Sequence, residues 1–98
     1  MILYGKAIRV MIADDSLIFR ETITTLLAND PDISVVASAG NGREAFALCQ
    51  QHMPDVVLMD IRMPECDGIE GTRLIKSHFP GVKVIIFTTF EDQDYITE

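Results

Sequence analysis

Three acidic residues stand at the ends of two apolar runs in this sequence. Asp14 and Asp15 follow the run IRVMIA, and Asp60 follows the run VVLM. Both runs are apolar at nearly every position, as is typical of strands buried on both faces of a parallel sheet. The carboxyl ends of such strands are where an open α/β sheet places its chemistry. Neighbouring carboxylates repel one another, so this pattern predicts a divalent cation with oxygen ligands, Mg²⁺ in particular.

Four apolar runs rich in valine and isoleucine recur along the chain. They span residues 7–13, 33–39, 56–59 and 82–87. Their spacing fits a strand followed by a crossover helix, repeated. Such alternation predicts an α/β fold with a parallel sheet, right-handed crossovers and helices on both faces. With the first strand central, the expected architecture is a flavodoxin-like doubly wound sheet of order 2-1-3-4, whose switch point lies between strands 1 and 3.

Apolar residues at helical spacing separate these strands. Asp15 or Ser16 would cap the first helix, Asn41 and Gly42 open the second, and the third begins near Gly68. Each helix would turn one apolar stripe inward. The three stripes are Phe19, Ile23, Leu26 and Leu27; then Ala45, Leu48 and Cys49; and last Thr72, Ile75 and Phe79.

Composition and charge exclude several classes of protein. With 98 residues, of which 48% are hydrophobic and 23% charged, the chain predicts one globular domain. The net charge of -7 and the scattered basic residues argue against direct binding of nucleic acid. Cys49 and Cys66 form no metal-binding motif. The first residues contain no apolar region of signal-peptide length, since Arg9 interrupts them, and no apolar stretch approaches membrane-spanning length. We therefore expect a cytoplasmic protein with no membrane partner.

The acidic turn after the first strand decides which phosphate chemistry is possible. A flavin or nucleotide would need glycines or hydroxyls there, whereas Asp14 and Asp15 repel phosphate unless a metal comes between. Mg²⁺ held by Asp15 and Asp60 could draw in a phosphoryl group, and Asp60 is the better candidate for the nucleophile. Thr88, at the end of the fourth strand, is placed to supply a hydroxyl to that group.

Together these residues resemble a known family. The acidic pair, Asp60, Thr88 and the pattern D-x-x-M-P-x-x-D-G over residues 60–68 look like the receiver domain of two-component response regulators. The likeness covers the chain from Lys6 onward and implies the CheY-like form of the flavodoxin-like fold. Segments 30–33, 39–45 and 88–90 look most like the LuxR-type (NarL-like) branch.

The resemblance assigns a role to each residue of the site. It implies that Asp60 accepts a phosphoryl group from a sensor histidine kinase and that Thr88 binds a phosphoryl oxygen and moves on activation. Magnesium would be bound by Asp15, by Asp60 and by the backbone carbonyl of Arg62, with Asp14 acting through water. Pro64 and Gly68 would shape the loop over the site.

The resemblance also implies parts that residues 1–98 do not supply. Receivers carry a phosphoryl-binding lysine and an aromatic switch residue on a fifth strand, and no residue up to Glu98 can be assigned to either. We therefore expect a receiver domain that is incomplete at its carboxyl end. A helix-turn-helix domain of the parent protein would make the contact with DNA. The open edge of strand 4 makes a homodimer possible.

These observations predict a phosphoacceptor that controls a transcription regulator. The alternative is a receiver-like interaction or dimerisation module that is not phosphorylated. A phosphatase with an aspartate nucleophile fits less well, since such enzymes place a second acid two residues later, where this chain has Arg62. We expect no enzyme activity beyond weak hydrolysis of the protein's own acyl phosphate.

Overall fold

The computed structural model describes residues 6–87 and shows a four-stranded parallel sheet of order β2-β1-β3-β4. The strands and helices alternate along the chain: β1 Ile8–Ala13, α1 Leu17–Leu27, β2 Ile33–Ala39, α2 Gly42–His52, β3 Val56–Asp60, α3 Gly68–His78 and β4 Lys83–Phe87. This confirms the predicted doubly wound α/β fold and strand order. The position of a fifth strand lies outside the described residues.

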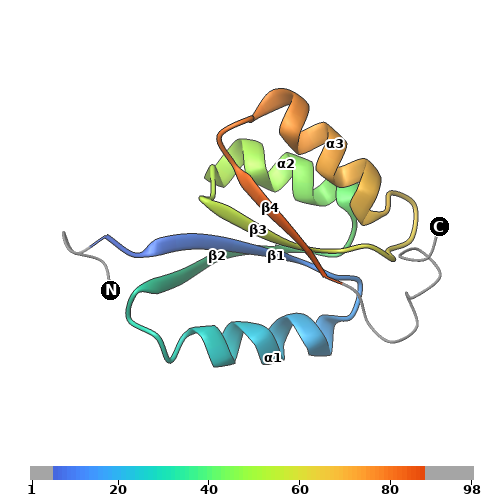
Figure 1. Ribbon diagram of the computed structural model, residues 1–98. Coiled ribbons are helices and arrows are strands. Elements are labelled where there is room, and N and C mark those ends of the chain that lie inside the picture. Colours follow the sequence, from blue (N-terminus) through green and yellow to red (C-terminus); the bar gives the residue numbers. More distant parts are fainter. Residues whose placement is uncertain (1–5, 88–98) are drawn as a thin grey trace.

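The helices cover the two faces of the sheet unequally. Helix α1 lies alone on one face, and α2 and α3 lie together on the other (Figure 1). The main core lies under α2 and α3, where alternate residues of the central strands point. Its buried members include Met11, Val57, Met59, Cys49 and Ile75.

Side chains at the starts of the helices fix where each helix begins. Ser16, not Asp15, caps α1, because the Ser16 hydroxyl accepts a hydrogen bond from the Phe19 amide at 3.2 Å. The Asn41 side chain accepts from the Glu44 amide at 2.8 Å, and that of Asp67 accepts from the Glu70 amide at 2.9 Å. These bonds satisfy backbone donors that no turn of the helix can satisfy.

Helix α1 departs from the predicted stripe. Leu26, expected to point inward, is 60% exposed, and none of the residues of α1 is fully buried. The reason is that α1 has no neighbouring helix on its face of the described sheet, so only its side toward β1 and β2 is shielded (Figure 1). In contrast, α2 buries Ala45 and Cys49, and α3 buries Ile75, as predicted.

Candidate functional site

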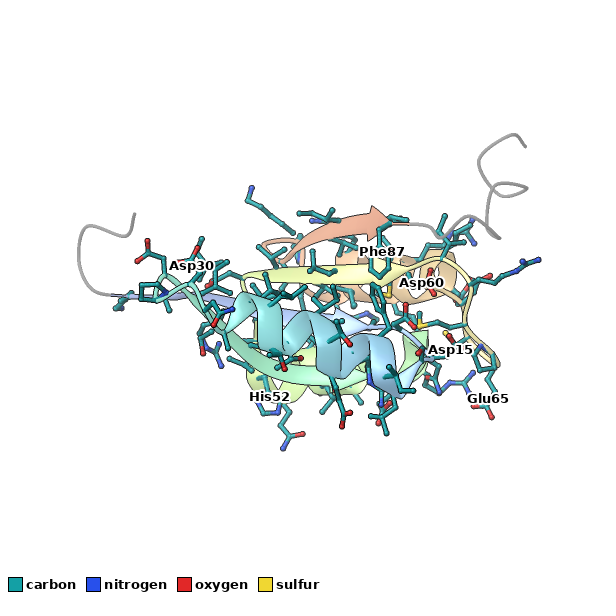
Figure 2. All side chains as sticks on the ribbon, turned by 90° about the horizontal axis from the view of Figure 1, so that it is seen from below. Asp15, Asp30, His52, Asp60, Glu65 and Phe87 are labelled. Atoms are coloured by element: carbon teal, nitrogen blue, oxygen red, sulfur yellow. The ribbon has the colours of Figure 1, made fainter. Side chains whose placement is uncertain are left out.

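The sheet register brings the three acidic residues to one end of the molecule. Ala13 pairs with Met59 across β1 and β3, so Asp14 and Asp60 are the next residues on adjacent strands. Asp60 is itself the last residue of β3, so this strand is one residue longer than the predicted run 56–59. One carboxylate oxygen from each of Asp14, Asp15 and Asp60 lies within 4.8 Å of the others. Figure 2 shows Asp15 and Asp60 at this end of the sheet, far from Asp30.

The amide, the carbonyl and the side chain of Asp14 each make a hydrogen bond. Its amide donates to the carbonyl of Ala39 on β2 at 2.9 Å, and its Oδ1 accepts from the Ser16 amide at 2.8 Å. Its carbonyl accepts from Nη1 of Arg20 at 2.7 Å. Asp14 and Asp60 are each only 3% exposed, whereas Asp15 is exposed to solvent. The site therefore has two buried carboxylates and one that reaches outward.

Burial makes the ionised form of Asp14 unfavourable. Loss of hydration is the main cause that raises the pKa of Asp14, and the negative charge of Asp15 raises this pKa further. The Ser16 amide, the Asp60 side chain and Arg20 act in the opposite direction without cancelling the shift. An all-oxygen donor set that is held together against its own repulsion suits a hard divalent cation such as Mg²⁺.

We expect Asp14→Asn to stabilise the metal-free protein by about 1 kcal/mol at pH 7. The raised pKa means that ionised Asp14 destabilises the fold above that pKa. This cost falls as the pH drops through the raised pKa and is gone below the ordinary value, so the gain should vanish in acid. Urea unfolding in EDTA at pH 7 and in acid measures both effects. Glu21→Gln, an exposed control on α1, should change stability by less than about 0.5 kcal/mol. A loss of stability in Asp14→Asn at pH 7 would contradict the argument.

Hydrogen bonds close the loop that follows β3. The Gly68 amide donates to the Ile61 carbonyl at 2.8 Å, and the Cys66 amide donates to the Pro64 carbonyl at 2.6 Å. Glu65 adopts φ 67°, so the loop contains a left-handed turn. Pro64 lies in this loop, whereas Gly68 is the first residue of α3 and lies against the backbone of Asp60. Their loop-shaping role stays a prediction. Arg62 is exposed in this loop, and the role of its carbonyl stays a prediction. Thr88 lies outside the described residues.

Comparison with known proteins identifies this arrangement. A family described as "Response regulator receiver domain" matches residues 10–98. The chain belongs to this family. The receiver is 48% identical over 91 residues to the transcriptional regulatory protein LnrK of Bacillus subtilis. This match covers 93% of the receiver and 41% of LnrK. A protein-glutamate methylesterase/protein-glutamine glutaminase of a Nocardioides species is 46% identical, over 88% of this chain and 24% of the methylesterase.

Solved structures agree with the branch that the sequence indicated. A LuxR-family two-component response regulator from Aurantimonas superposes on the receiver with a TM-score of 0.83 at 34% identity. The match covers 94% of this chain and 66% of that structure. The receiver is thus of the LuxR-type branch, and it spans about two fifths of LnrK. Within residues 6–87, no helix is long and apolar enough to cross a membrane.

Sequence reasoning missed one residue that contacts the site. Arg20 attracted no attention because a cation on a polar helix face is ordinarily solvated. Its position, one turn beyond the capping residue Ser16, was the available signal, since long helical side chains run back toward the start of the helix. Only the structure shows that the guanidinium reaches the Asp14 carbonyl.

Proposed function

We propose that this receiver is a phosphoacceptor in which Asp60 takes a phosphoryl group from a sensor histidine kinase. The observation that carries the proposal is the meeting of Asp14, Asp15 and Asp60 within 4.8 Å at the carboxyl ends of adjacent strands. A buried carboxylate beside two others has little use in stabilising a fold, because it raises the cost of folding. Membership of the receiver family supports the same role.

The transfer needs little covalent chemistry from the protein. A carboxylate oxygen of Asp60 attacks phosphorus, the bond from phosphorus to the kinase histidine breaks, and the imidazole leaves with its electron pair and takes up a proton. Bound Mg²⁺ would neutralise charge on the phosphoryl oxygens. Its ligands would be Asp15, Asp60 and the Arg62 carbonyl, while Asp14 would orient a metal-bound water. Thr88, in its proposed role, donates a hydrogen bond to a phosphoryl oxygen.

Phosphorylation would switch the DNA-binding output of a transcription regulator. LnrK, a transcriptional regulatory protein, is more than twice the length that the match covers, and the proposed DNA-binding output belongs to such a larger protein. The methylesterase match shows that other outputs occur among relatives. We assign no enzyme activity to this chain beyond slow hydrolysis of its own acyl phosphate, and we propose a cytoplasmic location. An unphosphorylated interaction module remains the alternative function.

Small phosphodonors provide the direct test. Incubation with acetyl phosphate and Mg²⁺ should add one phosphoryl group to the protein, as measured by intact mass. EDTA should prevent this gain, because the carboxylates then repel the donor. Failure of the longest available form of the protein to gain any phosphoryl mass with Mg²⁺ would favour the unphosphorylated interaction module.

We further propose that the 98-residue chain, taken by itself, forms pairs through β4, the outermost strand of the described sheet. Ile85 and Ile86 are 54% and 43% exposed on opposite faces of this strand, and Val84–Phe87 contains no charge that would discourage pairing. Ile86→Lys should therefore lower the sedimentation-average mass toward that of a monomer at high concentration. Ile69→Lys, at a 40% exposed position on α3, is the matched control and should not. A wild-type chain that stays monomeric would disprove the association.

A further inference from the structure

Arg20 contacts the main chain of the turn that carries Asp14 and Asp15. It lies in α1, and its Nη1 donates to the main-chain carbonyl of Asp14 at 2.7 Å. The Asp14 amide is tied to β2 and its side chain to Ser16, so this bond fixes the remaining polar group of the residue. The conformation of Asp14 sets the direction in which the chain enters Asp15.

The same guanidinium packs against a second turn. A Cβ atom built on Gly40 would lie 3.2 Å from Nη1 of Arg20, which is closer than an ordinary van der Waals contact. That turn is itself held, because the Gly40 amide donates to Oε1 of Glu44 at 2.6 Å. Nε of Arg20 is buried and has no hydrogen-bond acceptor among residues 6–87. The half-buried guanidinium therefore lies against both the β1–α1 and the β2–α2 turns, with its Nε shielded from solvent.

We propose that Arg20 is a positioning residue for the metal site, fixing the Asp14 carbonyl and hence the turn that presents Asp14 and Asp15. The inference rests on the proposed function, because it takes these carboxylates to be the Mg²⁺ site. Arg20 touches neither metal nor phosphoryl group in this role. The guanidinium acts through the backbone, and it needs both the length and the planar fork of arginine.

A purely electrostatic role would have the opposite consequence. A positive charge beside the carboxylates disfavours the approach of a second cation, so its removal alone would strengthen Mg²⁺ binding. Loss of a positioning contact weakens binding even though the repelling charge has gone. The sign of the change in Mg²⁺ affinity thus separates the two roles.

Isothermal titration of the full chain with Mg²⁺ tests the inference. Arg20→Met and Arg20→Lys should each bind Mg²⁺ about tenfold more weakly than the wild type, as is common when a group supporting metal ligands is lost. Tighter binding by Arg20→Met together with unchanged binding by Arg20→Lys would overturn the positioning role. Arg9→Met is the matched control, because Nη1 of Arg9 bonds the Met53 carbonyl at 2.8 Å in the same manner at the other end of β1. Its Mg²⁺ affinity should stay within about twofold of the wild type.

Kinetics separate positioning from loss of fold. In both Arg20 variants, the Mg²⁺ concentration for half-maximal phosphorylation by acetyl phosphate should rise about tenfold. The rate at saturating Mg²⁺ should stay near that of the wild type, since bound metal then holds the turn. A fall in the saturated rate with unchanged Mg²⁺ dependence would overturn the inference. Absence of Mg²⁺ binding by the wild type would instead overturn the proposed function, and the role of Arg20 with it.

Discussion

Replacing Asp60 by asparagine is expected to abolish phosphorylation of the receiver, lowering its rate to below about one hundredth of the wild-type value. Asparagine has the shape of aspartate, but its amide carries no charge and is a poor nucleophile toward phosphorus. Asp60 is buried at 3% exposure and is the last residue of β3, so the sheet fixes the position of its backbone at the site. The carboxylate of the exposed Asp15 lies close to that of Asp60, but its proposed role is to bind Mg²⁺ and not to accept the phosphoryl group.

The measurement is intact mass after reaction with acetyl phosphate and Mg²⁺, followed by mapping of the modified residue. Asp55→Asn provides the matched control, since Asp55 lies just before β3 and the substitution removes the same charge. Oδ2 of Asp55 accepts a hydrogen bond from the Arg9 amide at 2.8 Å, and asparagine retains an acceptor for this bond. Asp55→Asn should react like the wild type. Phosphoryl mass that persists in Asp60→Asn would assign the acceptor to another residue.

Topology explains why so much of the site could be predicted. Asp14 and Asp60 are far apart in sequence, and only the strand order places β1 beside β3. That order followed from apolar runs that alternate with helical stripes, because few arrangements bury both. Once β1 and β3 are neighbours, their register aligns the carboxyl ends and brings the acidic residues together.

The parts that could not be predicted depend on side-chain geometry. Periodicity gave Leu26 a place in the inward stripe of α1, but periodicity carries no information about how much of that face another element covers. The choice between Asp15 and Ser16 as cap turned on which oxygen meets the Phe19 amide. Arg20 depended on the path of a long, flexible side chain. These are differences of a few ångströms, which no spacing rule resolves.

A second large effect is expected from Gly68→Ala, which should destabilise the receiver by about 3 kcal/mol or more. A Cβ atom at position 68 would overlap the Asp60 carbonyl oxygen and lie 2.8 Å from its carbon and 2.9 Å from the Ile61 Cα. All three are backbone atoms, so no side-chain rotation relieves the overlap. The start of α3 would have to move away from the end of β3 and lengthen the bond from the Gly68 amide to the Ile61 carbonyl. Urea unfolding monitored by circular dichroism measures the loss.

The location of the overlap gives this substitution a second consequence. The displaced group belongs to Asp60 itself, so any Gly68→Ala protein that folds should also bind Mg²⁺ more weakly. Gly81→Ala is the control, because nothing lies within 4 Å of a Cβ atom built on Gly81. This variant should stay within about 0.5 kcal/mol of the wild type, with unchanged Mg²⁺ affinity. If Gly68→Ala matched Gly81→Ala in both measurements, the contact between α3 and β3 would be loose, and the loop after Asp60 would not depend on glycine to shape the site.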